Sequence, residues 1–227
     1  MTYTLITANR NYSSWSLRPW MLLKGLGIPF EERIELFASD DNHAAFRAFS
    51  PTGQVPCLVH GERTIWDSLG IALYLAERHD GVWPADEDAR AWGYGAVAEM
   101  HGGFGALRNE CTMNVGVRVR PRPASDALVR NVARLAELWS EGLARFGGPW
   151  LAGPAFTAVD AFYAPVAFRV RTYGLDVGKA GQFWVERLLA HPAMRQWEAE
   201  ALAEPWREAA HEAELAAAGE IVADYRG

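Results

Sequence analysis

The sequence has few cysteines and no long apolar run. Only Cys57 and Cys111 occur among 227 residues, without a CxxC pair or a Cys/His ligand spacing. Neither a disulfide framework nor a metal site is therefore expected. No stretch reaches the roughly 18 consecutive apolar residues of a membrane span, and the N-terminus lacks a basic start followed by an apolar segment. We expect no membrane association and a cytoplasmic location.

A broad basic surface is also missing. The chain has 22 basic and 28 acidic residues, a net charge of -6. Such a chain does not attract phosphates generally, so nucleic acid is not an expected partner. Half of the residues are apolar, and a chain of this length can bury the cores of two modest domains.

The first 81 residues alternate between strand and helix patterns. Strands are expected at residues 2–8, 30–37, 57–60 and 64–66, and helices at residues 16–26, 41–49 and 68–78. Asp40 could cap the second helix and Asp67 the third. The order β-α-β-α-β-β-α, which ends with a hairpin and a helix, predicts an α/β domain over residues 1–81 with antiparallel strands in its sheet.

After residue 81 the pattern becomes helical. Helices are expected at residues 89–107, 125–146, 157–173, 181–189 and 192–203, with no convincing strand. Residues 204–225 are rich in alanine and glutamate and could pack back on the surface or fray. We expect residues 87–227 to form an all-helical second domain.

Small hydroxyl residues lie between the first strand and the first helix, in NYSSWSLRPW at residues 11–20. A helix N-terminus directs free N–H groups and a positive dipole end toward an anion. The hydroxyl of Ser13 or Ser14 could therefore donate a hydrogen bond to a thiolate and lower the pKa of that thiol. Alternatively, the two serines could only cap the helix.

Two further segments could bind a ligand. Gln54, Val55 and Pro56 lead into the third strand. A cis bond before this proline would expose the Val55 backbone to an extended peptide, although an ordinary trans turn is the commoner alternative. Asp67 and Ser68 begin the third helix and could bind an ammonium and a carboxylate, or serve as a cap.

The second half of the chain contains FTAVD at residues 156–160. Thr157 and Asp160 have the spacing of a capping box, with aspartate where glutamate or glutamine is usual. We expect this pair to act in folding.

Together these motifs resemble the cytosolic glutathione transferase family over nearly the whole chain. The most specific are PTGQVPCLV followed by WDSLGIALYLAE, and the FTAVD box; the loop NYSSWSLRPWMLLK resembles that of serine-type, zeta and theta-like bacterial members. The resemblance implies a thioredoxin-like N-terminal domain that binds glutathione, a helical C-terminal domain that shapes the second-substrate pocket, and a homodimer. It also implies a cis bond at Pro56, backbone pairing through Val55, and γ-glutamyl contacts from Asp67 and Ser68.

The chain departs from several classes of this family. It has no tyrosine at the position of the alpha, mu and pi classes and no cysteine in the loop, where zeta members carry Ser-Ser-Cys and this chain has Trp15. Both maleylacetoacetate isomerase and reductase activities are therefore less well supported. Cys57 is interpreted as a packing residue. The spacing to Arg18 favours Ser14 as the partner of the thiol, and a shift of one residue would favour Ser13.

The second-substrate pocket is expected between the two domains. Its predicted lining is Tyr12, Trp15, His101, Phe104 and Arg108. His101 could be an acid or base, or simply a packed or solvent-facing residue. Arg108 could hold an acidic substrate, or form an exposed salt bridge.

The expected activity is attack of the glutathione thiolate on a small hydrophobic electrophile, as in detoxification. Glutathione-dependent isomerisation or reduction is the alternative within the same fold. An alternative of another class is an interaction protein that has kept the fold without the chemistry, because a fold does not guarantee a function.

Overall fold

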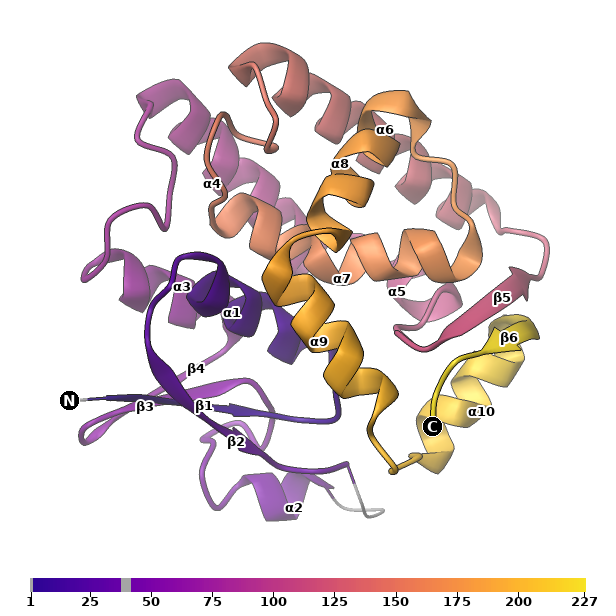
Figure 1. Ribbon diagram of the computed structural model, residues 1–227, viewed down its shortest axis with the longest axis horizontal. Helices are drawn as coiled ribbons and strands as arrows, with labels where there is room; N and C mark the ends of the chain where they lie inside the picture. The colour runs from indigo at the N-terminus through magenta and orange to yellow at the C-terminus, as the bar shows by residue number, and fades with distance from the viewer. Residues whose placement is uncertain (1, 38–41) are drawn as a thin grey trace.

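The computed structural model describes residues 2–37 and 42–227. Its N-terminal part contains a four-stranded sheet of β1 (Tyr3–Thr7), β2 (Phe30–Ile34), β3 (Cys57–His60) and β4 (Arg63–Trp66). The strands lie in the order β2-β1-β3-β4, with β1 parallel to β2 and antiparallel to β3, and with β3 and β4 forming a hairpin (Figure 1). The predicted mixed sheet is therefore confirmed.

Helices cover both faces of this sheet. Helices α1 (Ser14–Gly25) and α3 (Ser68–Ala76) pack together on one face, whereas the short α2 (Asn42–Phe46) lies on the other (Figure 1). Asp40, the predicted cap of the second helix, lies outside the described residues. The predicted cap of the third helix is confirmed, because the Asp67 carboxylate accepts a hydrogen bond from the Leu69 N–H at 2.7 Å.

The rest of the chain is mainly helical. Its helices are α4 (Glu87–Gly102), α5 (Gly105–Glu110), α6 (Asp126–Phe146), α7 (Ala158–Tyr173), α8 (Gly178–Leu189), α9 (Pro192–Leu202) and α10 (Ala209–Ala218). Helix α7 is buried along nearly its whole length and packs against α1, α4 and α8. It therefore joins the helical part to the sheet-bearing part in one core. No helix in the described part of the chain is long and apolar enough to cross a membrane.

The single helix predicted over residues 89–107 is wrong, because the chain turns between α4 and α5. A Cβ atom on Gly103 would lie 2.5 Å from the carbonyl oxygen of Glu99. The next residue, Phe104, has a left-handed backbone with a φ of 55°. A close backbone approach and a left-handed residue together end the first helix.

The expectation of no strand after residue 81 is also wrong. Strands β5 (Val117–Pro121) and β6 (Gly219–Asp224) form an antiparallel ribbon (Figure 1). The C-terminal tail, residues 203–227, thus holds both α10 and this strand. Each strand is short, and its apolar and polar residues alternate only weakly. Its hydrogen-bonding partner lies about a hundred residues away in the sequence, so a local pattern cannot reveal the pairing.

The capping box at α7 is confirmed. The Asp160 carboxylate accepts hydrogen bonds from the N–H of Thr157 at 3.2 Å, the N–H of Leu151 at 3.0 Å and the indole of Trp184 at 2.9 Å. Burial raises the pKa of Asp160 to about 6, against the opposing effect of these donors. The box therefore ties the start of α7 to a preceding loop and to α8, in keeping with a role in folding.

Candidate active site

A cavity of about 800 Å³ lies where the sheet-bearing part meets the helices. Its wall on the sheet side includes all seven residues that were predicted to bind or activate the first substrate. These are Ser13, Ser14, Gln54, Val55, Pro56, Asp67 and Ser68. Three separate segments that the sequence marked as candidates are thus brought to one place.

The two serines differ in their hydrogen bonding. The Ser13 hydroxyl donates to the Ser16 hydroxyl at 2.7 Å, and that oxygen accepts the Ala8 N–H at 3.2 Å. Ser14 is the first residue of α1, and its hydroxyl has no hydrogen-bond partner among the described residues. Ser13 stands at the cap position yet makes no side-chain capping bond. The Ser14 hydroxyl is therefore the one that remains free to donate into the cavity.

The peptide bond between Val55 and Pro56 is cis, as the resemblance implied. Within residues 2–37 and 42–227, neither backbone polar group of Val55 forms a hydrogen bond. They remain available to an extended ligand along this wall.

Cys57 follows directly and is fully buried. Burial raises the pKa of the Cys57 thiol to about 11. A thiol that stays protonated at neutral pH is a poor nucleophile, so the geometry agrees with a packing role.

The start of α3 presents two polar side chains to the cavity. Asp67 has a φ of 69°, and its side chain is 47% exposed. The Ser68 hydroxyl is fully buried and has no hydrogen-bond partner in the described part of the chain. An unpartnered buried hydroxyl costs free energy that a bound polar ligand would recover.

Of the residues predicted to line the second-substrate pocket, Tyr12, Trp15 and Arg108 line the cavity, but His101 and Phe104 do not. Phe104 is buried, with its ring 6.5 Å from that of Tyr163, because its left-handed backbone turns it into the core. These two assignments to the pocket wall are corrected accordingly.

His101 lies behind the wall. Its ring meets the edge of Trp15 at 5.4 Å, and its Nε2 atom is 3.5 Å from the Asp67 carboxylate. Burial lowers the pKa of His101 more than Asp67 raises it. At neutral pH the imidazole is therefore mainly uncharged and supports the residues that do face the cavity.

The cavity also has lining residues that sequence reasoning missed. They are Phe37, Asn42, His43, Phe46, Thr52, Gly53, Trp66, Thr112, Met113, Arg169, His211 and Glu214. Arg169 could have been found from the sequence, because it is a cation within the apolar run AFYAPVAFRV of a helix that proves to be buried. Nothing local linked His211 and Glu214 to a loop two hundred residues earlier.

The tail reaches the active-site loop through Tyr12. The Tyr12 hydroxyl donates to the Glu212 carboxylate at 2.7 Å, and the His211 ring stacks on Tyr12 at 4.9 Å and on Phe37 at 5.2 Å. Burial, followed by the Glu212 carboxylate, raises the pKa of Tyr12 well above its usual range. Because the Tyr12 hydroxyl already donates to Glu212, it is not available to stabilise a thiolate in the cavity.

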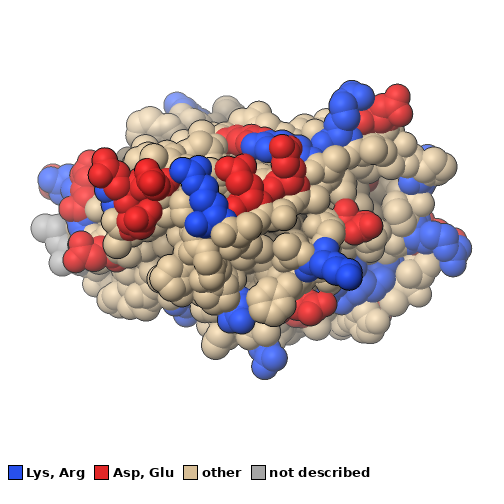
Figure 2. Space-filling view, turned by 90° about the horizontal axis from the view of Figure 1, so that it is seen from above, with Lys and Arg blue, Asp and Glu red and all other residues tan. Residues whose placement is uncertain are grey.

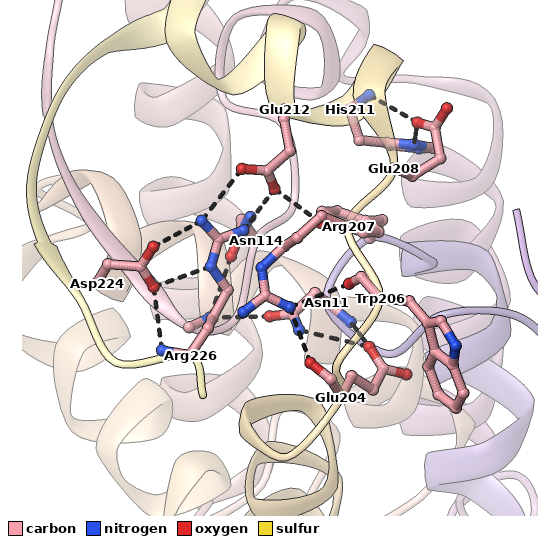
Figure 3. A network of polar contacts seen from close by, with 12 residues as sticks. Asn11, Asn114, Glu204, Trp206, Arg207, Glu208, His211, Glu212, Asp224 and Arg226 are labelled. Carbon is pink, nitrogen blue, oxygen red and sulfur yellow. Dashed lines mark hydrogen bonds and ion pairs between the residues drawn. The ribbon is translucent and has the colours of Figure 1, made fainter. Parts of the chain in front are cut away.

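A polar network fixes this arrangement (Figure 3). Arg226 forms ion pairs with Glu212 and with Asp224, between which it lies in the figure. Glu204 accepts hydrogen bonds from the backbone N–H of Arg10 at 2.7 Å and of Asn11 at 3.3 Å. The loop before α1 and the last residues of the chain therefore form one unit.

Among the described residues there is no group of three or more His, Cys, Asp or Glu side chains that could hold a metal ion. The polar groups of the cavity are hydroxyls, backbone and side-chain amides, carboxylates, arginines and two histidines, His43 and His211. Such a set can bind a small zwitterionic or anionic ligand and stabilise a developing negative charge.

Comparisons with known proteins show the family of the chain. Residues 12–78 match the model of the glutathione S-transferase N-terminal domain, and residues 122–200 match that of the C-terminal domain. Glutathione S-transferase 1 of Dianthus caryophyllus is 27% identical over 73% of this chain and 76% of its own. A zeta-class glutathione S-transferase of Euphorbia esula is 27% identical over 69% of this chain and 70% of its own.

The fold has solved counterparts. A glutathione transferase homologue from Burkholderia, determined with bound glutathione, superposes with a TM-score of 0.66 at 23% identity, over 88% of this chain and 98% of its own. This likeness shows that the two chains share a fold. With both of its characteristic domains matched, the chain belongs to the glutathione S-transferase family of enzymes.

Proposed function

We propose that the protein conjugates glutathione to small electrophiles, with Ser14 stabilising the glutathione thiolate. Family membership makes glutathione the co-substrate. The observation that carries the proposal is the convergence of Ser14, Val55 and the Asp67–Ser68 pair on one cavity. These three segments correspond to a thiol contact, a peptide-backbone contact and a contact for the charged end of a γ-glutamyl group.

The unpartnered groups of the wall fit glutathione. The Ser68 hydroxyl and the α3 N-terminus can donate to the γ-glutamyl carboxylate, and the Asp67 carboxylate can accept from its ammonium. The free N–H and C=O of Val55 can pair with the cysteinyl backbone. These contacts give hydrogen-bond partners to the Ser68 hydroxyl and the Val55 backbone, which have none among the described residues. They give a further partner to the partly exposed Asp67 carboxylate, which already accepts from the Leu69 N–H.

This binding would place the thiol beside Ser14 at the start of α1. A hydroxyl donor and the positive end of the helix dipole both favour the thiolate over the thiol. The sulfur lone pair then forms the bond to the electrophilic carbon, and the leaving group departs with its own electron pair. The protein contributes ionisation of the thiol and proximity of the two substrates.

Isomerisation is a second candidate, because a zeta-class enzyme is among the relatives. In that reaction glutathione would be returned unchanged, whereas conjugation consumes it. Trp15, at the position of the zeta-class cysteine, favours conjugation. We further propose a cytoplasmic homodimer divided into domains of residues 1–81 and 87–227, which sedimentation and limited proteolysis would test.

The test combines binding with turnover. Calorimetric titration with glutathione, followed by conjugation to chlorodinitrobenzene, is to be measured for the wild type, Ser14→Ala and Ser13→Ala. We expect all three to bind glutathione and only Ser14→Ala to lose turnover, by about ten- to a hundredfold for one charge-assisted hydrogen bond. Absence of glutathione binding by the wild type would refute the proposal, and a larger loss in Ser13→Ala would exchange the roles of the serines.

A further inference from the structure

Three arginines gather behind and within the helical wall of the cavity. Arg108 at the end of α5 and Arg169 in α7 both line it. Arg18 in α1 is 1% exposed, and its guanidinium lies 4.0 Å from the centre of the Trp15 ring, which Arg108 also faces at 5.4 Å. Arg18 and Arg108 therefore meet around the indole of Trp15, and Arg169 lies close enough to repel Arg18.

This cluster has no carboxylate partner among the described residues. Arg169 donates from Nε to the Cys111 carbonyl at 2.7 Å, and Arg108 donates to the His101 carbonyl at 3.2 Å. The Nε and Nη1 atoms of Arg18 are buried and have no hydrogen-bond partner in residues 2–37 and 42–227. The predicted alternative for Arg108, an exposed salt bridge, is not what the structure contains.

Cationic side chains on the protein surface have different neighbours from those of the cluster. On the face shown in Figure 2, many of the lysine and arginine side chains lie beside acidic ones. None of the three arginines of the cluster forms an ion pair with a carboxylate of the described residues. Burial, followed by repulsion from Arg169 and Arg108, lowers the pKa of Arg18 to about 9, although the Asp67 carboxylate partly opposes this. Burial likewise lowers the pKa of Arg169 to about 10. The cluster is thus a positive site without a paired carboxylate and only partly compensated by Asp67, in a medium where charge acts strongly.

Its position separates it from the groups assigned to glutathione. Val55, Asp67 and Ser68 lie on the sheet side, whereas Arg108 and Arg169 come from helices α5 and α7 on the opposite side. The carboxylates in the lining, Asp67 and Glu214, are exposed, so solvent weakens their effect on the buried cations. An anion at the helical wall would therefore belong to the second substrate.

We propose that Arg108 and Arg169, supported by Arg18, bind a carboxylate of the electrophile, so that the enzyme prefers organic anions over neutral apolar acceptors. This inference rests on the proposed function, since it specifies the substrate class of the same cavity. Guanidinium groups suit the task because their planar donors match the two oxygens of a carboxylate. The charge that remains unpaired in the free protein is neutralised when such a substrate binds.

The test uses one chlorodinitrobenzoic acid as its carboxylate and as its methyl ester. In both reactions the glutathione sulfur forms the carbon–sulfur bond and chloride leaves with its electron pair. Because the ester group withdraws electrons from the ring more strongly than the carboxylate, each kcat/KM is divided by the rate constant of the uncatalysed reaction with glutathione before the two probes are compared. We expect the wild type to show a higher kcat/KM for the carboxylate, carried mainly by KM. In Arg108→Met the ratio of carboxylate to ester kcat/KM should fall about tenfold, and Arg108→Lys should retain most of it.

Arg130→Met is the matched control, because Arg130 is exposed on α6 and does not line the cavity. It should leave the ratio unchanged. Equal kcat/KM for the two probes in the wild type, or an equal loss on both in Arg108→Met, would overturn the proposal. The second outcome would mean that Arg108 acts on glutathione.

Calorimetry of the two S-aryl glutathione conjugates separates this inference from the proposed function. If neither probe is turned over but the carboxylate conjugate binds about tenfold more tightly, with Arg108 required, the anion site stands and the conjugating function fails. If turnover occurs and both conjugates bind equally, the function stands and the anion site fails.

Discussion

Replacing Arg18 with methionine should stabilise the free protein, although it removes a buried side chain of α1. The guanidinium has no hydrogen-bond or ion-pair partner among the described residues and is 1% exposed. Holding a cation in such a place costs free energy, which replacement by an apolar side chain of similar volume removes. Methionine can follow the path of the arginine stem and fill irregular space.

The magnitude follows from the net burial of the charge and from its nearest compensating contact, the Trp15 ring. The pKa of Arg18 is lowered from 12.5 to about 9, which at about 1.4 kcal/mol per pKa unit disfavours the cation by about 5 kcal/mol. The stack on Trp15 at 4.0 Å offsets about 2 kcal/mol of this in a desolvated site. A net gain of about 2 to 3 kcal/mol remains, which corresponds to a rise in Tm of about 5 to 10 °C for a chain of this size.

Differential scanning calorimetry without glutathione measures this gain. Arg130→Met serves as the control, and its exposed position should keep the change within about 0.5 kcal/mol. With a saturating carboxylate conjugate the advantage of Arg18→Met should shrink, because the bound anion stabilises the cation in the wild type. A Tm for Arg18→Met at or below that of the wild type would refute the view that burial of this charge is not fully compensated.

Three further predictions concern the capping box, the tail and the ligand. Asp160→Asn should lower the free energy of unfolding by about 3 kcal/mol, since an amide turns N–H groups toward donors that now bind a carboxylate; a loss under about 1 kcal/mol in urea denaturation would contradict this. For Glu212, burial raises the pKa, but bonds from Arg226 and Tyr12 outweigh it and leave the pKa below its usual 4.5. The contacts of Glu212 that anchor the tail should therefore be complete above pH 4.5 and be lost as the pH falls through the lowered pKa of Glu212. Below that pH, pepsin should cut the tail before the rest of the chain, and uniform digestion would contradict this prediction. Ser68→Ala should weaken glutathione binding about tenfold in calorimetry without lowering Tm, because its hydroxyl is unpartnered in the free protein; unchanged affinity would remove Ser68 from the glutathione site.

Local patterns were sufficient wherever neighbouring residues provide the interaction. The caps at Asp67 and Thr157 were predictable because each bonds within three residues of itself. The order of strands and helices in the first 81 residues followed from periodicity, and the sheet that it predicts is present. Boundaries shifted by a few residues, since helix ends depend on contacts outside the helix.

Predictions failed where a residue depends on a distant partner. The break between α4 and α5 comes from a backbone approach at Gly103 that composition does not reveal. Phe104 therefore faces the core, although its place in an expected continuous helix put it in the pocket. The ribbon of β5 and β6 was missed for the same reason, because neither strand has a strong pattern of its own.

The sequence by itself determined the mixed α/β start, the mainly helical second half and the caps, because these depend on periodicity and on hydrogen bonds between neighbouring residues. The cis bond at Pro56 and the grouping of the serine loop with Val55 and the start of α3 came from the resemblance to a known family, since the residues alone favoured a trans turn. Only the tertiary structure decided that the tail packs against Tyr12 and that Arg18 lies near Arg108 and Arg169, the two arginines that line the cavity. Burial and the mutual repulsion of charges depend on which distant segments meet, so they exist only once the chain has folded.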